Sequence, residues 1–199
     1  MTQGKSIGLT GGIATGKSTV SDYLATRYQC RILDADIYAR EAVAQGSPIL
    51  QRIFQRYGDE VRDADGSLKR QALGNIVFRD ETEKAWLESQ IHPLVRQRFA
   101  EELSGDHPAN PPVVCVIPLL IEANLVDLVD EIWVVTCKPD QQLQRLQTRN
   151  QLSFDQAQDR IQSQMPLREK IKVADVVLDN SSDLATLQQQ VDQALKRSC

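Results

Sequence analysis

Residues 11–18 have the spacing of a phosphate-binding loop. They read Gly-Gly-Ile-Ala-Thr-Gly-Lys-Ser, which fits the pattern G-x-x-x-x-G-K-[ST]. In such a loop the backbone N–H groups surround phosphate oxygens, and the helix that follows adds partial positive charge. We expect Lys17 to reach the β- and γ-phosphates of a nucleotide and the Ser18 hydroxyl to ligate Mg²⁺. The predicted nucleotide contacts are Gly11, Gly12, Ile13, Ala14, Thr15, Gly16, Lys17, Ser18 and Thr19.

Two aspartates are the second candidate for chemistry. Asp34 and Asp36 follow the strand-like segment 30–33, at the kind of strand end where open α/β sheets bind ligands. In an extended chain residues i and i+2 point to the same side, so both carboxylates would face one ligand. One could accept a proton from an attacking hydroxyl, since a weak base suffices for phosphoryl transfer, while the other holds metal-bound water. The alternative is that the pair only starts a helix, a role that Asp also favours.

Glu122 and His92 carry less specific signals. Glu122 follows the apolar segment 113–121 and would either lie near a metal ion or cap the next helix. His92-Pro93 would either form a turn before a helix or contact a substrate, and a lone histidine is more often structural. The segment Asp63-x-x-Gly66 resembles a GTPase switch, but it does not follow an apolar strand and no Asn-Lys-x-Asp occurs. The sequence therefore does not favour a GTPase.

Five apolar segments are expected to form the sheet that positions these groups. They are near-continuous rather than alternating, which is typical of parallel strands covered on both faces. Helical patterns separate them, so we predict an α/β fold with a five-stranded parallel sheet between helices. One helix is expected at 19–28, and the last at 183–197 with Ser182 as its cap. The apolar stripe of this last helix consists of Leu184, Leu187, Val191 and Leu195. The predicted strands are 6–10, 30–33, 113–117, 131–136 and 175–178.

Two segments are too long for simple connections within the single domain expected over residues 1–199. Residues 39–103 are mostly helical with a break at Gly58–Gly66, which predicts an inserted helical lobe, and residues 104–112 would return to the sheet. Residues 141–174 contain a capping box at Ser153 and Gln156 and an excess of basic residues, which predicts a mobile cationic lid. The alternative is a solvated helical hairpin. The basic residues are Arg145, Arg149, Arg160, Arg168, Lys170 and Lys172.

Composition narrows the class of protein. The chain has 199 residues, 41% hydrophobic and 25% charged, as expected of a globular protein with a real core. A formal net charge of −4 argues against a dedicated nucleic-acid binder. No apolar run is long enough for a membrane span, and the N-terminus runs into the first strand without room for a signal peptide. Four cysteines without metal-ligand spacing predict reduced thiols and a cytoplasmic location.

Several motifs in the same order resemble the dephospho-coenzyme A kinase family. The phosphate loop alone is shared with many kinases, whereas Asp-Ala-Asp-x-x-Ala-Arg and Pro-Leu-Leu-x-Glu are more specific together. The matches span nearly the whole chain, with small departures at Ala14-Thr15, where Gly-Ser is commoner, and at Ser182, where Gly is frequent. The matching segments are 9–19, 34–40, 92–94, 118–122 and 174–180.

The resemblance implies a function and a set of site residues. It implies ATP-dependent phosphorylation of the ribose 3′-hydroxyl of dephospho-CoA, the last step of CoA synthesis, on a five-stranded core with a helical CoA-binding lobe and a lid. Asp36 would act as the base, Arg145 and Arg149 of the lid would contact the phosphates, and Asn180 would lie near the adenine. ATP and Mg²⁺ are the implied donor and ion. The matched motifs also make Asp34, Asp36, Arg40, His92 and Glu122 candidate contacts of the acceptor.

Two other functions remain open on the residues alone. The first is another small-molecule kinase, acting on a nucleoside or a nucleoside monophosphate. The second is a nucleotide-binding protein without catalysis, against which Lys17, Ser18 and Asp36 argue. The oligomeric state is not predicted.

Overall fold

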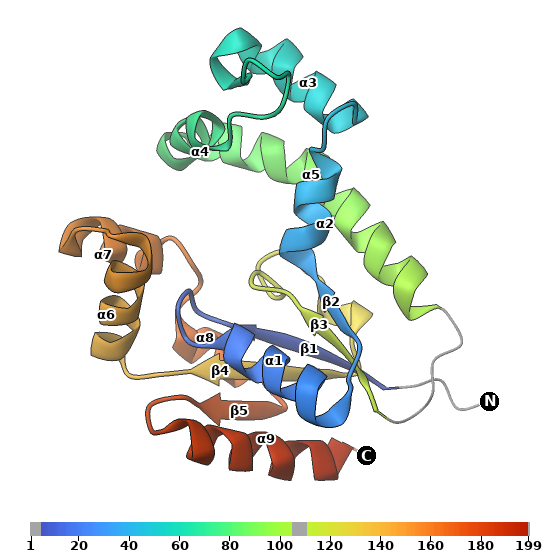
Figure 1. Ribbon diagram of the computed structural model, residues 1–199, viewed down its shortest axis with the longest axis vertical. Helices are drawn as coiled ribbons and strands as arrows, with labels where there is room; N and C mark the ends of the chain where they lie inside the picture. Colours follow the sequence, from blue (N-terminus) through green and yellow to red (C-terminus); the bar gives the residue numbers. More distant parts are fainter. Residues whose placement is uncertain (1–4, 105–110, 199) are drawn as a thin grey trace. The chain divides into compact units, whose positions relative to one another are not determined.

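The chain forms two compact units in the computed structural model, which describes residues 5–104 and 111–198 (Figure 1). The first unit comprises Met1–Asp34 and Leu103–Cys199, and the second is Ala35–Glu102. The second unit begins four residues before the lobe expected at 39–103. Most of the loop expected at 104–112 lies outside the described residues. None of the helices within the described ranges has the length and apolar character of a membrane span.

A five-stranded parallel sheet organises the first unit, which confirms the predicted α/β fold. Its strand order is β2-β3-β1-β4-β5, so the strand that leads into the phosphate loop lies at the centre. The observed bounds differ from the predicted ones by at most two residues. The strands are β1 Ser6–Gly11, β2 Ile32–Asp34, β3 Val113–Val116, β4 Glu131–Thr136 and β5 Val176–Asp179.

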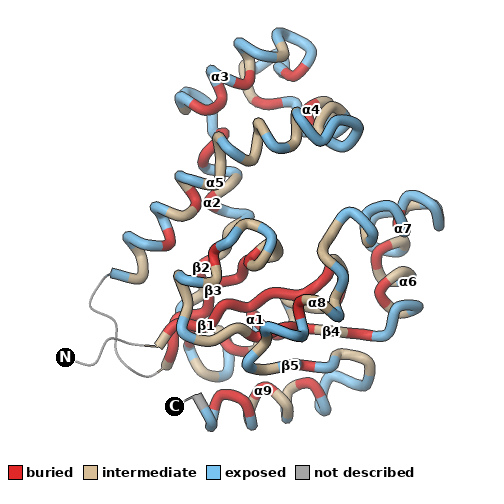
Figure 2. Tube along the Cα trace, turned by 180° about the vertical axis from the view of Figure 1, so that it is seen from behind, coloured by how far each residue is buried: buried red, intermediate tan, exposed pale blue. Residues whose placement is uncertain are grey.

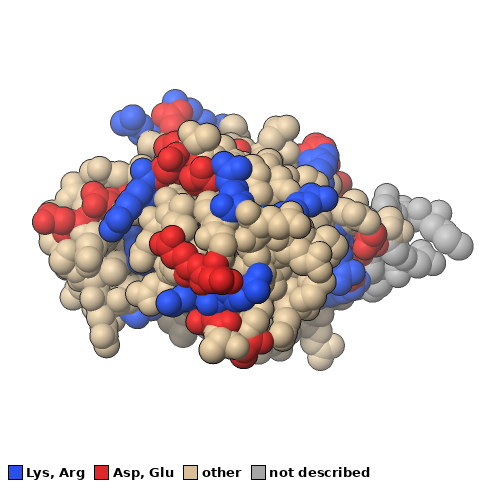
Figure 3. All heavy atoms as spheres, turned by 90° about the horizontal axis from the view of Figure 1, so that it is seen from above, with Lys and Arg blue, Asp and Glu red and all other residues tan. Residues whose placement is uncertain are grey.

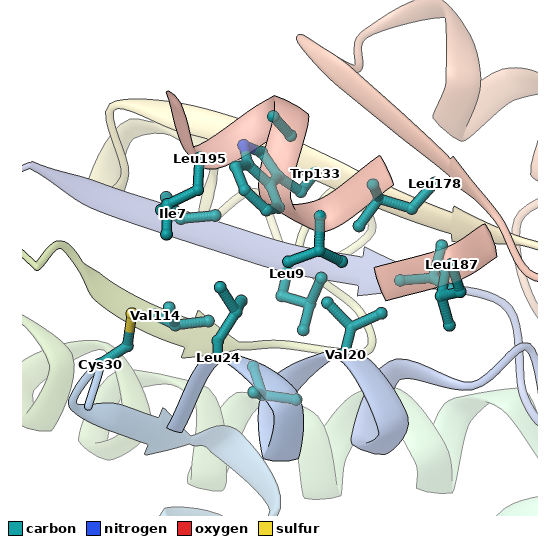
Figure 4. Close-up of a cluster of buried hydrophobic side chains, with 14 residues drawn as sticks. Ile7, Leu9, Val20, Leu24, Cys30, Val114, Trp133, Leu178, Leu187 and Leu195 are labelled. Atoms are coloured by element: carbon teal, nitrogen blue, oxygen red, sulfur yellow. The ribbon is translucent and has the colours of Figure 1, made fainter. Parts of the chain in front are cut away.

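The central strands are covered on both faces, as their apolar sequences predicted. Every residue of β1 and β3 is buried, and Figure 2 shows buried residues following the strands. Helices α1 (Lys17–Tyr28) and α9 (Leu184–Ser198) cover one face, where Trp133 of β4 is fully buried (Figure 4). On the other face Gly8 lies so close to Leu120 and Val129 that a Cβ would come within 2.8 Å of each. The segment that follows β3 therefore packs directly on the central strand.

Helix α9 starts differently from the prediction. The Asp183 carboxylate, not Ser182, accepts the Thr186 N–H at 2.8 Å, and this hydrogen bond lowers the pKa of Asp183. Leu184 is exposed, whereas Leu187, Val191 and Leu195 are buried as expected.

The segment between β4 and β5 consists of three helices. They are α6 (Pro139–Asn150), α7 (Phe154–Gln162) and α8 (Leu167–Lys172). Helix α7 begins with the predicted capping box, in which the Ser153 hydroxyl accepts the Gln156 N–H and the Gln156 side chain accepts the Ser153 N–H. Between β3 and β4 lies a short 3₁₀ turn, η2 (Val126–Leu128).

The second unit is helical and has its own apolar core. The core is built mainly from α3 and the segments around it, with Leu50, Ile53 and Val61 almost completely buried. Ser47 starts α3 by accepting the Leu50 N–H at 3.1 Å. The elements are α2 Ala35–Ala42, α3 Pro48–Tyr57, η1 Gly58–Val61, α4 Arg70–Arg79 and α5 Glu81–Leu103.

Of the two alternatives for His92-Pro93, a turn before a helix or a substrate contact, the structure excludes the turn. Helix α5 runs through Pro93 without interruption. A proline inside a helix removes one backbone hydrogen bond and clashes with the preceding turn. Here packing outweighs that cost, because Leu87 and Ile91 pack against the core of the unit before the proline and Phe99 is fully buried after it.

A polar cluster joins α3 to α5. Glu83 accepts two hydrogen bonds from Arg56, at 2.7 and 2.9 Å, and one from the Tyr57 hydroxyl at 2.6 Å. The Arg56 guanidinium also lies 4.6 Å from the centre of the Trp86 ring. These hydrogen bonds lower the pKa of Glu83 to about 2, and burial together with Glu83 raises the pKa of Tyr57 to about 12.

Candidate functional site

The phosphate loop connects β1 to α1, as its sequence context predicted. β1 ends at Gly11 and α1 begins at Lys17, so the loop N–H groups gather at a helix N-terminus. The Lys17 ammonium donates to the carbonyls of Gly11 at 3.2 Å and Gly12 at 2.8 Å. The Thr15 hydroxyl donates to the Gly12 carbonyl at 2.9 Å. The lysine that should meet phosphate oxygens therefore lies directly over the loop.

Two loop glycines are required by their surroundings. Gly11 and Gly16 have φ values of 147° and 105°, where a side chain is strained. A Cβ on Gly11 would collide with the Val135 carbonyl, and one on Gly16 with the Asn180 amide. The backbone can make this tight bend only with glycine at both positions.

Ala14 has the left-handed conformation without being glycine. Its φ is 58°, which costs an alanine roughly 1–2 kcal/mol. Alanine in place of the commoner glycine keeps the backbone N–H as a donor, but it strains the backbone of the loop.

Asn180 lies against the phosphate loop. Its side-chain amide donates to the Thr15 carbonyl at 2.8 Å, and its own N–H donates to the Thr136 carbonyl at 2.8 Å. Its carbonyl accepts a hydrogen bond from Arg145 at 3.1 Å. The structure thus brings three predicted parts together, namely the loop, Asn180 and Arg145 of α6.

The two predicted lid arginines have different surroundings. Both lie on α6, one turn apart, but only Arg145 is partly buried, with one guanidinium nitrogen hidden from solvent and without a hydrogen bond to the described residues. Arg149 is exposed and donates to the neighbouring Asn150 side chain at 2.9 Å. Arg145 is held beside Asn180, whereas Arg149 extends into solvent.

The expected geometry of the aspartate pair is wrong. Asp34 is the last residue of β2, and α2 begins at Ala35, so Asp36 lies in the first turn of a helix. Residues two apart do not share a face there, and the argument from an extended chain does not hold. The two carboxylates belong to different units, Asp34 to the sheet and Asp36 to the helical unit.

Asp36 and Arg40 share a cavity within the helical unit. The cavity has a volume of about 400 Å³ and is lined mostly by apolar side chains. Asp36 and Arg40 are one helical turn apart on α2, and Arg70 of α4 adds a second positive charge. An apolar wall with a few polar groups is typical of small-molecule sites. His92 is half-buried within α5 and does not line this cavity.

Glu122 does not cap a helix. Its carboxylate lies 2.8 Å from the ammonium of Lys170 in α8. It also accepts the N–H of Met165, which lies between α7 and α8, at 3.3 Å. Lys170 is fully buried and also donates to the Pro118 carbonyl at 2.9 Å. Its expected place in a solvated or mobile cationic surface is therefore wrong, and sequence analysis missed its pairing with Glu122.

The residues at the loop fit a hard cation. Ser18 is exposed at the start of α1 and offers a hydroxyl oxygen, the type of ligand that Mg²⁺ takes. Within the described residues no group of three or more His, Cys, Asp or Glu side chains could hold a metal by itself. Mg²⁺ in phosphoryl-transfer sites usually has few protein ligands and completes its shell with phosphates and water.

Comparison with known proteins identifies the family. A sequence model of the family "Dephospho-CoA kinase" matches residues 5–186. The dephospho-CoA kinase of Trichormus variabilis is 57% identical over 195 residues, covering 98% of each chain. Among solved structures, Thermus thermophilus TT1252 aligns with a TM-score of 0.81 at 32% identity, covering 98% of each chain. The dephospho-CoA kinase of Campylobacter jejuni aligns with a TM-score of 0.70 at 26% identity, covering 96% of each chain. The chain therefore belongs to the dephospho-CoA kinase family.

Proposed function

We propose that this protein transfers the γ-phosphoryl group of ATP to the ribose 3′-hydroxyl of dephospho-CoA, giving CoA and ADP. The observation that carries the proposal is the cavity of about 400 Å³ that Asp36 and Arg40 line. These residues lie two and six positions after the end of β2, which pairs with β3 in the sheet that carries the phosphate loop. An acidic group and basic groups in an otherwise apolar cavity suit a bulky acceptor that bears both a hydroxyl and phosphates.

The phosphate loop binds the triphosphate. Its N–H groups and the dipole of α1 provide partial positive charge, and the Lys17 ammonium moves from the loop carbonyls to the β- and γ-phosphates. Ser18 holds Mg²⁺, which neutralises charge on the phosphates when bound. Asn180, fixed beside Thr15, borders the adenine.

Asp36 accepts the proton of the 3′-hydroxyl at its carboxylate. The oxygen of that hydroxyl forms a bond to the γ-phosphorus while the bond to the β-phosphate oxygen breaks, so ADP leaves. A carboxylate is a weak base, but the loose transition state of this reaction depends more on positioning than on early deprotonation. Asp34, the last residue of β2, would orient water on Mg²⁺ when the ion is bound.

The helical unit holds the acceptor. Arg40 and Arg70 offer guanidinium groups for the acceptor's phosphates, and the apolar wall accommodates the pantetheine arm. His92 and Glu122 remain further candidate contacts. Residues 141–174 act as the lid, within which Arg145 and Arg149 meet the transferring phosphoryl group. Lys170, which is buried against Pro118 and Glu122, belongs to the fixed base of this segment. Gln142 and Gln164 belong to it as well, because they hydrogen-bond to the phosphate loop at Ile13.

A comparison of acceptors tests the proposal. ADP formation is measured with ATP, Mg²⁺ and, in separate reactions, dephospho-CoA, nucleosides and nucleoside monophosphates. We expect turnover with dephospho-CoA that exceeds turnover with the other acceptors by at least about 100-fold. Preferred turnover of a nucleoside or nucleotide would favour a different small-molecule kinase. Absence of ADP with every acceptor would favour a binding protein without catalysis.

We place the reaction in the cytoplasm. Cys30, Cys115 and Cys137 are buried and form no disulfide within the described residues, as suits a reducing compartment. The net charge of −4 and the mixture of acidic and basic side chains on the face seen in Figure 3 differ from the basic face typical of nucleic-acid binders.

A further inference from the structure

The peptide groups around Ile13, within the phosphate loop, are held by two glutamines from the segment between β4 and β5. The Gln164 side chain accepts the Ile13 N–H at 2.7 Å. The Gln142 side chain donates to the Ile13 carbonyl at 2.8 Å. The N–H and the carbonyl of Ile13 are therefore both hydrogen-bonded, the carbonyl to α6 and the N–H to the segment between α7 and α8.

Gln142 is fitted closely to the loop. Its side chain is buried, although glutamine usually lies at the surface. A Cβ on Gly12 would come within 2.6 Å of the Gln142 amide nitrogen, so the absence of a side chain at position 12 makes room for this contact. The Gln142 amide is buried and reaches the loop only because position 12 has no side chain. The contact is therefore part of the packed interior and not a chance contact at the surface.

Gln164 is held in turn by the Glu122–Lys170 pair. The residue after it, Met165, donates its N–H to Glu122, which is paired with the fully buried Lys170. Lys170 also donates to the Pro118 carbonyl, and that carbonyl accepts the hydroxyl of Thr10 at 3.1 Å. The same group of residues thus touches the phosphate loop at Ile13 and the strand directly before it at Thr10.

We propose that Gln142 and Gln164 are positioning residues for phosphoryl transfer, with Glu122 and Lys170 as their support. The inference rests on the proposed function, because it concerns how well the loop is arranged for the reaction. Phosphoryl transfer depends on donors held in place before the reaction, and a displacement of about 1 Å far from the reacting atoms can cost roughly 100-fold in rate. A loop gripped at Ile13 keeps its neighbouring N–H donors in one arrangement.

Gln164 accepts a hydrogen bond through its amide oxygen, whereas Gln142 donates one through its amide nitrogen. This difference makes the proposal testable. Position 164 needs an acceptor, which glutamate keeps. Position 142 needs a donor, which an ionised glutamate lacks. Both replacements add one negative charge near the phosphates, so Gln164→Glu and Gln142→Glu are matched in charge and differ in the hydrogen bond. Gln164→Ala removes the acceptor without adding charge, and Gln162→Ala on the exposed end of α7 is the control.

The experiment measures the loop directly as well as turnover. Exchange of the Ile13 amide hydrogen is followed by heteronuclear NMR without nucleotide, and kcat and KM for ATP are measured with dephospho-CoA. We expect Gln164→Ala to speed exchange at Ile13 by at least about tenfold and to lower kcat about 10- to 100-fold, with a smaller change in KM. Gln164→Glu should keep the slow exchange, Gln142→Glu should lower kcat more than Gln164→Glu, and Gln162→Ala should match the wild type.

Two results would overturn the proposal that Gln142 and Gln164 position the loop. One is an Ile13 amide that exchanges equally slowly in Gln164→Ala and the wild type. The other is a kcat within about twofold of the wild type for both Gln164→Ala and Gln142→Glu. If buried Gln142 cannot be replaced without unfolding, the comparison of Gln164→Ala with Gln164→Glu still decides. An inactive wild type refutes the proposed function but leaves the exchange measurement valid, so the two failures are distinguishable.

Discussion

At the scale of single residues, the proposed function divides the reaction between the phosphate loop and Asp36. Lys17 lies over the loop carbonyls in one unit, and Asp36 lines the cavity of the other. The proposal therefore assigns charge on the donor and proton transfer from the acceptor to separate side chains, which can be removed separately.

We predict that Lys17→Ala and Asp36→Asn both reduce turnover by about 100-fold or more but differ in ATP binding. Loss of the Lys17 charge weakens binding of the triphosphate, whereas Asp36→Asn acts at the acceptor and keeps ATP affinity. Turnover is measured as ADP release and ATP affinity by titration. Near-normal turnover of Asp36→Asn would remove Asp36 from the mechanism.

The two arginines of α6 provide the second residue-scale prediction. Charge spreads over the transferring group in the transition state, and arginine binds such oxygens in a planar fork. We expect Arg145→Ala and Arg149→Ala to lower kcat by more than about tenfold, with a smaller rise in KM for ATP. Arg145→Lys and Arg149→Lys keep the charge and serve as matched variants. Losses below about tenfold for both alanine variants would mean that this stretch is only a solvated face.

At the scale of elements, the cluster that joins α3 to α5 makes the helical unit sensitive to acid. Glu83 has a pKa of about 2 in the fold against an ordinary value near 4.3 in an unfolded chain. A lowered pKa stabilises the fold above the unfolded value, and that stabilisation is lost as the pH falls toward 2. Tyr57 makes the unit sensitive to high pH. Because its pKa is raised to about 12 in the fold, its stabilising contribution is present below about pH 10 and is lost as the pH rises toward 12.

We predict that Glu83→Gln speeds hydrogen exchange in α3 and α5 at pH 7 and that the difference from the wild type shrinks as the pH falls from about 4.5 toward 2. Exchange of peptides from these helices is measured by mass spectrometry across that range, with intrinsic rates corrected for pH. Glu81→Gln, at the start of the same helix, is the control, because its partner Lys84 lies 3.6 Å away in an exposed pair. A difference that persists unchanged below pH 3 would show that ionisation of Glu83 does not matter.

At the scale of the whole molecule, the proposed function assigns donor and acceptor to the two different units of the chain. The sheet unit carries the phosphate loop, and the helical unit carries the cavity with Asp36. Each substrate should therefore leave its own pattern of protection.

We predict that dephospho-CoA slows hydrogen exchange within residues 39–103 and that ATP with Mg²⁺ slows it at residues 11–19. Bound groups shield amides and suppress local opening, which is the reason for the expected slowing. Exchange is measured with each substrate alone, and with CoA and ADP together as a product control. Protection by dephospho-CoA confined to the phosphate loop would contradict an acceptor site in the helical unit.

The sequence by itself determined the parts of this protein that depend on local pattern. The phosphate loop, the continuous apolar strands and the capping box at Ser153 each follow from residue types at fixed spacing, and all three are present in the structure. Local pattern also allowed a turn at His92-Pro93 as one of two alternatives, but no turn forms there, because apolar side chains packed on both sides of Pro93 hold the helix together.

Only the tertiary structure decided which distant side chains meet. Gln142 and Gln164 are separated from Ile13 by 129 and 151 residues, and nothing in their spacing indicates that they grip its peptide groups. The same holds for Lys170, which belongs by composition to a basic surface but is buried with Glu122 and Pro118. Short-range patterns reflect backbone preference and burial along one element, whereas these contacts arise from how the sheet brings the ends of β1, β3 and β4 to one edge.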